Sequence, residues 1–232
     1  MAKPVRRRAS RLSSEQRIAN ILSIAREVIR ERGYEDLSMA EIAAKAGVVE
    51  GTIYRYFETK RDLLVRVAED WFSEHLNRDP NLPSIKGTWN RLRHLVWRAL
   101  EITKREPVLT RFLLTELRPS ASYRSSPFFD LNRRFTGEIR SLCQGAIAAG
   151  EFQSDVSPSL LRDMIFGCIE HQTWAYLRNE GDFDINETAD GITNVIYRGM
   201  IVTVGKFGDL DRQVARLTTL GDRLELALAA RG

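Results

Sequence analysis

The residues best suited to chemistry lie close together near the N-terminus. Thr52, Tyr54, Arg55 and Tyr56 fall within one short stretch, and Lys60 follows it. Hydroxyl groups and an ammonium group at this spacing suit hydrogen bonds to phosphate oxygens. Arg55 adds a guanidinium group, and arginine is the residue that most often pairs with O6 and N7 of guanine. The stretch therefore predicts a surface that contacts nucleic acid.

The elements that must position these residues have the pattern of a helix-turn-helix over residues 38–57, with the sequence MAEIAAKAGVVEGTIYRYF from position 39. Ala43 is small where two helices cross, and Gly47 permits the positive φ of a tight turn. Apolar side chains form the wedge between the helices, namely Ile42, Val48 and Ile53. In this motif the second helix projects into the major groove of DNA.

Positive charge gathers in front of this motif. The net charge is +4, yet residues 1–66 alone carry 14 basic and 9 acidic groups. Arg6, Arg7, Arg8 and Arg11 precede the first acidic residue, which suits an arm that inserts into the minor groove. A solvated tail remains an alternative. Binding to a membrane surface fits less well, because Trp, Phe and Leu are not interleaved with the arginines.

Two stretches resemble the DNA-binding domain of TetR-family regulators, ERGYEDLSMAEIAAKAG and AGVVEGTIYRYFETKRDLL, within about residues 13–72. The resemblance implies phosphate contacts by Tyr54, Tyr56 and Lys60, groove-facing Thr52 and Arg55, a helix cap at Ser38, and base approach by Val49, Glu50 and Gly51. It also implies a palindromic double-stranded operator. From the residues alone, Tyr54 also suits core packing, and Arg55 and Glu50 also suit solvated surface charges.

The remaining sequence predicts an all-α protein, because helix caps and 3.6-residue periodicity recur and alternating strand patterns are missing. Capping boxes predict helix starts at Ser13 with Gln16 and at Ser38 with Glu41, and Thr59 with Asp62 begins a further helix. Further helices are predicted over residues 50–57, 88–105, 108–118, 127–149, 158–181, 186–206 and 209–230. We expect a basic arm (1–12), a three-helix helix-turn-helix DNA-binding domain (13–78), a larger helical ligand-binding and dimerisation domain (84–208) and an extra helix (209–232).

Three segments of the larger domain resemble the branch of TetR-type repressors that controls fatty-acid breakdown and responds to acyl-CoA. They are FLLTELRPS, IAAGEFQSD and LLRDMIFGCIEHQTWAYL. The resemblance implies a hydrophobic small-molecule effector, such as a long-chain acyl-CoA. Large apolar side chains suit a narrow tunnel, although each also suits plain core: Trp89, Trp97, Phe112, Leu113, Phe128, Phe135, Ile165 and Trp174. Basic residues that suit CoA phosphates or a solvated face are Arg93, Arg98, Lys104, Arg105, Arg111, Arg118 and Arg124.

A homodimer is expected, because a helix-turn-helix reads two half-sites related by two-fold symmetry. TetR-like proteins pair through their last two major helices, which here span about residues 157–180 and 186–206. Gly191 and Gly199 lie on the second of these and permit close approach.

Catalysis, metal binding and a cofactor are not expected. His75, His94 and His171 have neither metal-ligand spacing nor a neighbouring nucleophile, and no phosphate-cradling glycine-rich loop occurs. Cys143 and Cys168 lie on apolar helical stripes, which predicts two core thiols. The N-terminus has no apolar signal region and no apolar run reaches a membrane span, so a cytoplasmic protein is expected. Alternative functions are a repressor of an efflux or metabolic gene that responds to a drug-like or aromatic ligand, and a helical interaction protein that does not bind DNA.

Overall fold

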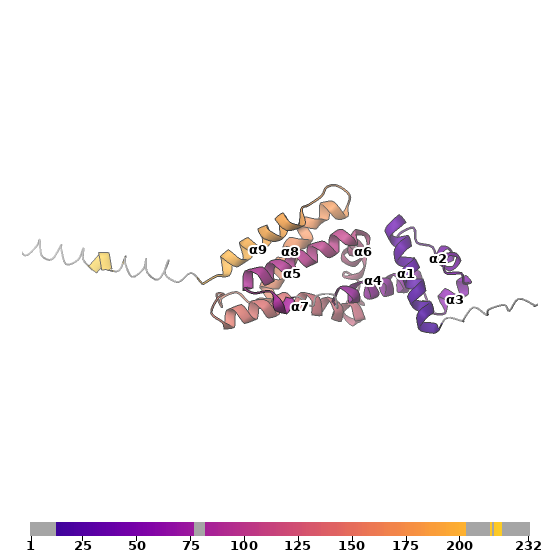
Figure 1. Cartoon of the computed structure of the whole chain (residues 1–232), viewed down its shortest axis with the longest axis horizontal. Helices are drawn as coiled ribbons and strands as arrows, with labels where there is room; N and C mark the ends of the chain where they lie inside the picture. Colours follow the sequence, from indigo (N-terminus) through magenta and orange to yellow (C-terminus); the bar gives the residue numbers. More distant parts are fainter. Residues whose placement is uncertain (1–12, 77–81, 203–213, 215, 220–232) are drawn as a thin grey trace, which may run out of the picture.

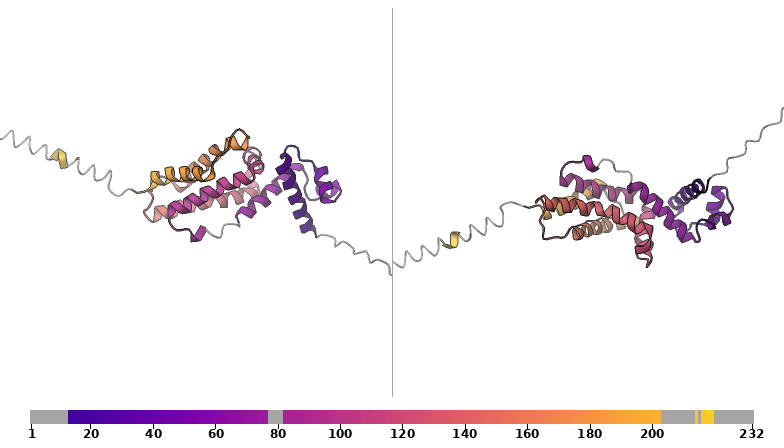
Figure 2. Two further views of the ribbon diagram at one scale, coloured as in Figure 1. Left: turned by 45° about the horizontal axis from the view of Figure 1, so that its top comes forward. Right: turned by 90° about the horizontal axis from the view of Figure 1, so that it is seen from below.

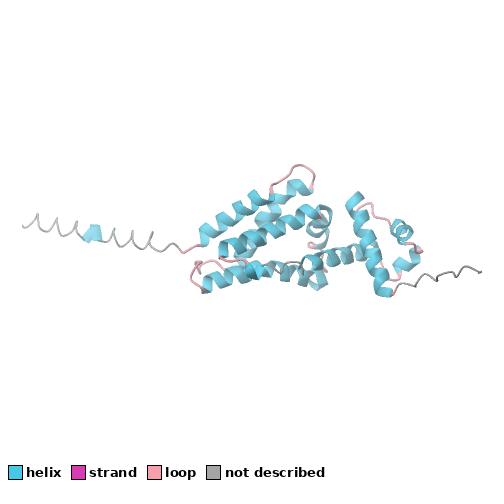
Figure 3. Ribbon diagram, in the orientation of Figure 1, coloured by secondary structure: helices cyan, strands magenta, loops and turns pink. Residues whose placement is uncertain are grey.

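The computed structural model describes residues 13–76, 82–202, 214 and 216–219, and these are helical or form connecting loops (Figure 3). The extended pairing among them is a single bridge between Phe152 and Ile201. The predicted all-α fold is confirmed. The predicted arm (1–12) and most of the predicted tail helix (209–230) lie outside the described residues.

The N-terminal unit consists of three helices and the start of a fourth, which leads away into the rest of the protein (Figure 1). These helices are α1 (Ser14–Arg32), α2 (Met39–Ala46), α3 (Glu50–Tyr54) and α4 (Lys60–Leu76). The apolar face of α1 is buried against α2 and α4. Gly33 ends α1 with a φ of 89°.

Two of the predicted helix starts are confirmed. Ser13 and Gln16 form a reciprocal capping box, and Thr59 and Asp62 do the same in front of α4. The predicted box at Ser38 is wrong, because its side chain makes no capping hydrogen bond to α2. Glu41 instead pairs with Arg32 of α1 and Lys45 of its own helix, at 3.4 and 3.7 Å.

The larger part is a bundle in which long helices lie side by side (Figures 1 and 2). Its helices are α5 (Thr88–Arg105), α6 (Pro107–Phe112), the π-helical segment η2 (Leu113–Leu117), α7 (Pro127–Ala148), α8 (Pro158–Leu177) and α9 (Ile185–Met200). Short 3-10 turns precede α5 and α7, namely η1 (Leu82–Ser84) and η3 (Tyr123–Ser125).

Several predicted helices end earlier than expected. The predicted helix 50–57 ends at Tyr54, and the predicted helix 158–181 ends at Leu177. The predicted helix 186–206 ends at Met200, because the chain after it pairs with the loop before α8. There the amide of Gln153 donates to Met200 O at 2.8 Å, and that of Val202 donates to Glu151 O at 2.9 Å.

Helix α4 joins the two parts through a shared apolar core. Near its C-terminal end, the ring of Phe72 lies 5.1 Å from that of Phe128 and 5.2 Å from that of Phe135, measured between centroids. Both partners belong to α7. Because Trp71 beside it is also buried, α4 is packed firmly into the bundle at one end and into the N-terminal unit at the other.

Candidate nucleic-acid interface and ligand cavity

The turn between α2 and α3 has the geometry of the predicted helix-turn-helix. Gly47 adopts the left-handed conformation, with φ 66° and ψ 32°, which favours glycine. The amide of Val48 donates to Ala43 O at 3.0 Å and so closes the end of α2. Ile42 and Ile53 are fully buried, whereas Val48 is half-buried. The wedge fixes the orientation of α3 relative to α2.

The outer face of α3 is open to solvent. Val49 is 74% exposed and Tyr54 is 46% exposed, so Tyr54 is not a core residue. Glu50 and Gly51 are exposed beside them, whereas Thr52 is half-buried. The structure thus brings the predicted base-approaching residues together on one accessible surface.

Arg55 and Tyr56 form a pair at the end of this surface. The Arg55 guanidinium lies 5.2 Å from the centroid of the Tyr56 ring, and Arg55 Nη2 donates to Tyr56 Oη at 3.2 Å. Ser14 Oγ donates to the same phenol oxygen at 3.5 Å. The Ser14 hydroxyl and then the Arg55 guanidinium lower the pKa of Tyr56 to about 8. Arg55 is therefore held over Tyr56 and exposed on its outer side.

Ser38 precedes α2, and Lys60 is the first residue of α4. Lys60 Nζ donates to the backbone oxygen of Glu35 at 2.6 Å, and Ser38 is exposed with its hydroxyl free of the expected cap. Two donor groups therefore lie at the N-terminal ends of α2 and α4. The arginines of the predicted arm, Arg6, Arg7, Arg8 and Arg11, lie outside the described residues.

A cavity of about 110 Å³ lies inside the bundle. Its walls come from α4, α5, α6, η2, α7 and α8, and most of them are apolar. Three of the predicted tunnel residues line it, namely Leu113, Phe128 and Phe135. Side chains that sequence reasoning missed also line it, above all Trp71, Phe72 and Thr110. Small-molecule sites typically occupy roughly 300–1,000 Å³, so this cavity is narrow.

The other predicted tunnel residues lie elsewhere. Phe112 packs edge-on against Tyr34 of the N-terminal unit, with centroids 5.2 Å apart, and Ile165 is fully buried outside the cavity lining. The three tryptophans make other contacts: Trp89 Nε1 donates to Asn194, Trp97 stacks on His94, and Trp174 lies beneath Arg178. Sequence periodicity identifies these side chains as inward-facing but does not show which of them border empty space.

Most of the candidate phosphate-binding residues have carboxylate partners. Arg118 borders the cavity and pairs with Glu170, another lining residue, at 2.9 Å. The other pairs are Arg93–Asp190, Arg98–Glu138, Lys104–Asp182, Arg105–Glu101 and Arg111–Glu35. Arg124 is exposed. Arg118 is therefore the candidate that lies at the cavity.

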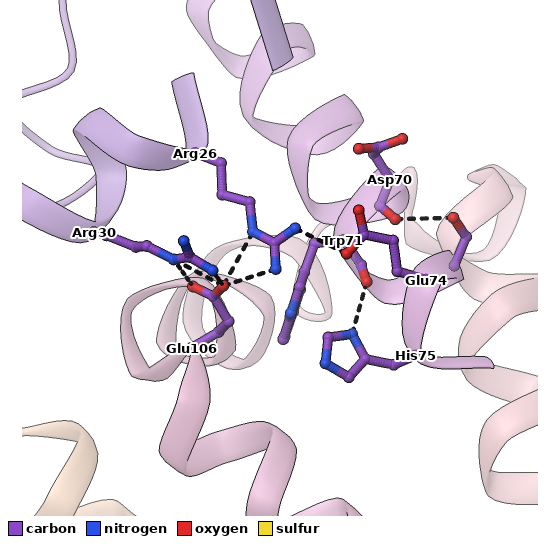
Figure 4. Close-up of polar contacts among 8 residues, drawn as sticks. Arg26, Arg30, Asp70, Trp71, Glu74, His75 and Glu106 are labelled. Carbon is purple, nitrogen blue, oxygen red and sulfur yellow. Dashed lines mark hydrogen bonds and ion pairs between the residues drawn. The ribbon is translucent and has the colours of Figure 1, made fainter. Parts of the chain in front are cut away.

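A buried carboxylate joins the N-terminal unit to the bundle (Figure 4). Glu106, only 2% exposed, lies at the break between α5 and α6 and accepts hydrogen bonds from two arginines of α1. Arg26 Nη2 donates to it at 2.8 Å, and Arg30 Nε donates at 2.9 Å. Arg26 also bonds to Glu74 of α4 at 3.0 Å. Burial raises the pKa of Glu106, but the Arg30 and Arg26 hydrogen bonds outweigh it and hold that pKa below its ordinary value.

Residues in and next to the short helix α6 contact both the N-terminal unit and the cavity. Glu106, Arg111 and Phe112 contact the N-terminal unit, where Arg111 Nη2 donates to Glu35 at 2.8 Å. Thr110 and Leu113 face the cavity. The same short segment therefore borders the cavity and contacts both α1 and the α1–α2 loop.

The outer face of α8 and α9 carries small and apolar side chains. A groove of about 860 Å³ runs between them, lined by Met164 and Cys168 of α8 and by Gly191 and Val195 of α9, among others. Val195 is 73% exposed. Gly199 has open space around it. The predicted core position of Cys168 is wrong, because this thiol is exposed on the groove, whereas Cys143 is buried and its pKa is raised to about 11.

Comparison with known proteins identifies this architecture. The family described as bacterial regulatory proteins, tetR family, matches residues 21–67, and the tetracyclin repressor-like C-terminal domain matches residues 86–200. The chain belongs to the tetR family. This membership makes it a DNA-binding transcription regulator that responds to a ligand. The first match covers most of α1, all of α2 and α3 and the start of α4, and the second covers α5 to α9.

One curated relative and two solved structures show what this chain is similar to. The fatty acid metabolism regulator protein of Bacillus subtilis (strain 168) is 23% identical over 78% of this chain and 93% of its own. The crystal structure of FadR from Bacillus subtilis in complex with stearoyl-CoA has a TM-score of 0.67, with 23% identity, and covers 78% of this chain and 98% of that one. A regulator from Saccharomonospora viridis in complex with choline has a TM-score of 0.69, 21% identity and coverage of 82% and 100%.

Two features are absent from the residues that the structure describes. No helix there is both long and apolar enough to cross a membrane. No group of three or more His, Cys, Asp or Glu side chains is arranged to hold a metal ion.

Proposed function

We propose that this protein is a homodimeric repressor that binds a palindromic operator and is released from it by a long-chain acyl-CoA. The proposed DNA-contacting residues are those on and around α3, with the basic arm in the minor groove: Arg6, Arg7, Arg8, Arg11, Ser38, Val49, Glu50, Gly51, Thr52, Tyr54, Arg55, Tyr56 and Lys60. The exposed face of α3 supports this assignment. We place the DNA-binding domain within residues 13–78 and the ligand-binding and dimerisation domain within residues 84–208.

The acyl-CoA assignment is supported by the chemistry of the cavity and by the fatty acid regulator among the relatives. Aromatic and aliphatic side chains dominate the walls, and Arg118 supplies a cation at the cavity. Burying each methylene of an acyl chain contributes about 0.8 kcal/mol, roughly a fourfold gain in affinity. Affinity should therefore rise with chain length until the cavity is filled.

One observation carries the release mechanism: α4 and α6 line the cavity and also hold α1 in place. A long acyl chain needs more room than about 110 Å³, so its binding requires the walls to separate. A ligand shifts a conformational equilibrium by its differential affinity for the two states. Outward movement of α4 and α6 would change the position of α1, and with it the spacing of the two α3 helices on DNA.

Titration of acyl-CoAs of increasing chain length into a protein–operator complex tests this function. The operator is first recovered by selection from a pool of random duplexes, and release is followed by fluorescence anisotropy of the DNA. We expect release to improve with chain length and to be poor for short-chain CoA esters and free fatty acid. Equal release by all lengths, or by none, contradicts the acyl-CoA assignment and leaves DNA binding as a separate result.

A pair of neighbouring variants tests the location of the ligand. Leu114→Trp fills part of the cavity, because Leu114 lines it and is half-buried, whereas Thr115→Trp adds the same side chain at an exposed position. We expect both variants to bind operator, and only Leu114→Trp to resist release. Melting temperatures of both variants check that each is folded. Identical release would place the ligand elsewhere.

A further inference from the structure

Two polar atoms in the cavity walls have no hydrogen-bond partner within the described part of the chain. They are Nε1 of Trp71, on α4, and Oγ1 of Thr110, on α6. Both residues line the cavity, and Trp71 is 1% exposed. An indole N–H can only donate a hydrogen bond, and a threonine hydroxyl can donate or accept one. Two residues that line the apolar cavity therefore carry donors that no described residue accepts from.

The other neutral polar side chains around the cavity are already engaged. The Thr103 hydroxyl donates to Ala99 O at 3.2 Å, and the Thr173 hydroxyl donates to Ile169 O at 3.0 Å. Asn132 Nδ2 donates to Tyr123 Oη at 2.9 Å. A buried donor without a partner destabilises a folded protein, so most native structures satisfy such groups. Other such atoms among the described residues include Nε2 of His75 and Oγ1 of Thr193, which lie outside the cavity lining. Trp71 and Thr110 differ in that both line one cavity, which points to a partner that a ligand supplies.

The two donors are also placed where ligand contact affects the N-terminal unit. Trp71 lies one helical turn from Glu74, which bonds to Arg26 of α1 (Figure 4). Thr110 lies one turn from Glu106, and its amide donates to Glu106 O at 2.9 Å. A ligand atom held by both side chains would connect the two helices that anchor α1.

We propose that Trp71 and Thr110 donate hydrogen bonds to an acceptor oxygen of the effector, the carbonyl oxygen of its acyl thioester. The inference rests on the acyl-CoA function proposed above and adds the specificity-determining group. A site that provides buried donors rejects an analogue that lacks the acceptor, because the donors then stay unpaired in the complex. Chain length sets affinity through the aromatic walls, and the carbonyl sets selectivity.

The experiment compares stearoyl-CoA with S-octadecyl-CoA, the thioether in which a methylene replaces the carbonyl. Dissociation constants are measured by calorimetry on the full chain without DNA. We expect the wild type to bind the thioester about tenfold more tightly or better. Thr110→Val should bring this ratio toward one by weakening thioester binding alone. Trp71→Phe also removes volume from the cavity wall, so it changes the binding of both compounds but should still bring the ratio toward one. Thr110→Ser keeps the hydroxyl and should keep the ratio.

A second measurement tests the unpaired donor without any ligand. Thr110→Val removes a buried hydroxyl that has no partner and preserves the shape, so the ligand-free protein should melt at the same temperature as the wild type or higher. Thr103→Val is the matched control: its hydroxyl has a partner, so it should not melt higher and should keep the wild-type ratio. Trp71→Phe loses volume as well, so its melting temperature is not diagnostic.

The outcomes separate this inference from the function on which it rests. A wild type that binds both C18 compounds equally, or variants that keep the wild-type ratio, overturn the role of Trp71 and Thr110 while acyl-CoA binding stands. A wild type that binds neither compound overturns the acyl-CoA function and the thioester assignment together. A clear loss of stability in Thr110→Val contradicts the unpaired state of its hydroxyl.

Discussion

The Tyr56 phenol lies at the edge of the proposed DNA surface, between the Ser14 hydroxyl and the Arg55 guanidinium. Both neighbours favour the anionic phenolate, and they lower the pKa of Tyr56 to about 8. A neutral phenol can donate to a phosphate oxygen, whereas a phenolate repels it. The residue that the resemblance assigns to phosphate contact thus also titrates within an accessible pH range.

We therefore expect affinity for operator to fall as the pH rises through about 8. Only the protonated phenol can donate to a phosphate, so deprotonation of Tyr56 opposes DNA binding. The affinity for operator therefore begins to fall once Tyr56 of the free protein is deprotonated. Tyr56→Phe should weaken binding at neutral pH and remove this pH dependence. Fluorescence anisotropy between about pH 7 and pH 9 measures both effects. Parallel profiles for the two proteins would exclude a phosphate contact by Tyr56.

Single residues could be predicted from the sequence where the residue type alone determines the local backbone geometry. Gly47 was predicted from its turn, and its φ of 66° agrees. Ser38 was assigned a cap from spacing alone, and the basic partners that compete for the Glu41 carboxylate, Arg32 and Lys45, lie on α1 and α2. The missing information at Ser38 is tertiary, because Arg32 approaches Glu41 only after α1 and α2 have packed.

At the level of secondary structure, the break between α5 and α6 organises the contact between the two parts of the protein. Pro107 follows Glu106 and begins α6, so the chain changes direction at a residue whose carboxylate is buried. Two arginines of one helix, α1, converge on this group. Such a cluster fixes the position of α1 more firmly than a single surface ion pair would.

Glu106→Gln should destabilise the protein by about 1.5–3 kcal/mol, because it weakens charge-assisted hydrogen bonds to two arginines. The lowered pKa of Glu106 means that its stabilising effect is present near neutral pH and is lost as the pH falls through that pKa. Urea unfolding at neutral and acidic pH measures the difference. Glu101→Gln, at a half-buried pair with Arg105, is the control and should change little. Equal effects of the two substitutions would contradict the role of Glu106.

Helices were predicted from the sequence more reliably than their ends and contacts. The predicted helix 88–105 coincides with α5, since its amphipathic pattern is long and a glycine precedes it. The end of α9 could not be predicted, because it depends on pairing with a loop about fifty residues earlier in the chain. The Glu106 cluster was also missed, since its arginines lie about eighty residues away in sequence and nothing local distinguishes them from surface charges.

On the scale of the whole molecule, the unpaired face of α8 and α9 is the proposed dimer interface. It combines exposed Val195 and Met164 with glycines that leave room for another helix. The interface lies on helices distant in sequence from α3 (Figure 1). The predicted pairing through the last two major helices therefore stays a prediction that this surface supports.

Val195→Glu should convert the dimer to a monomer, because it places a charge in the centre of this apolar surface at no cost to the fold of the free chain. Gln144→Glu adds the same charge on the exposed side of α7 and should leave the dimer intact. Multi-angle light scattering gives the mass of each variant. The Val195→Glu variant should also lose most of its affinity for a two-half-site operator. A dimeric Val195→Glu protein would place the interface on another face.

One uninterrupted helix, α4, begins with Lys60 near α3 and reaches the cavity at Trp71. If that helix couples two binding events, thermodynamic reciprocity requires the operator to weaken effector binding by the same factor by which the effector weakens operator binding. Operator DNA then competes with the effector, because DNA binding favours the conformation that binds the effector more weakly. Each added operator copy in the cell raises the effector concentration needed for half-maximal response, so the sensitivity of the regulator depends on gene dosage as well as on its own affinity.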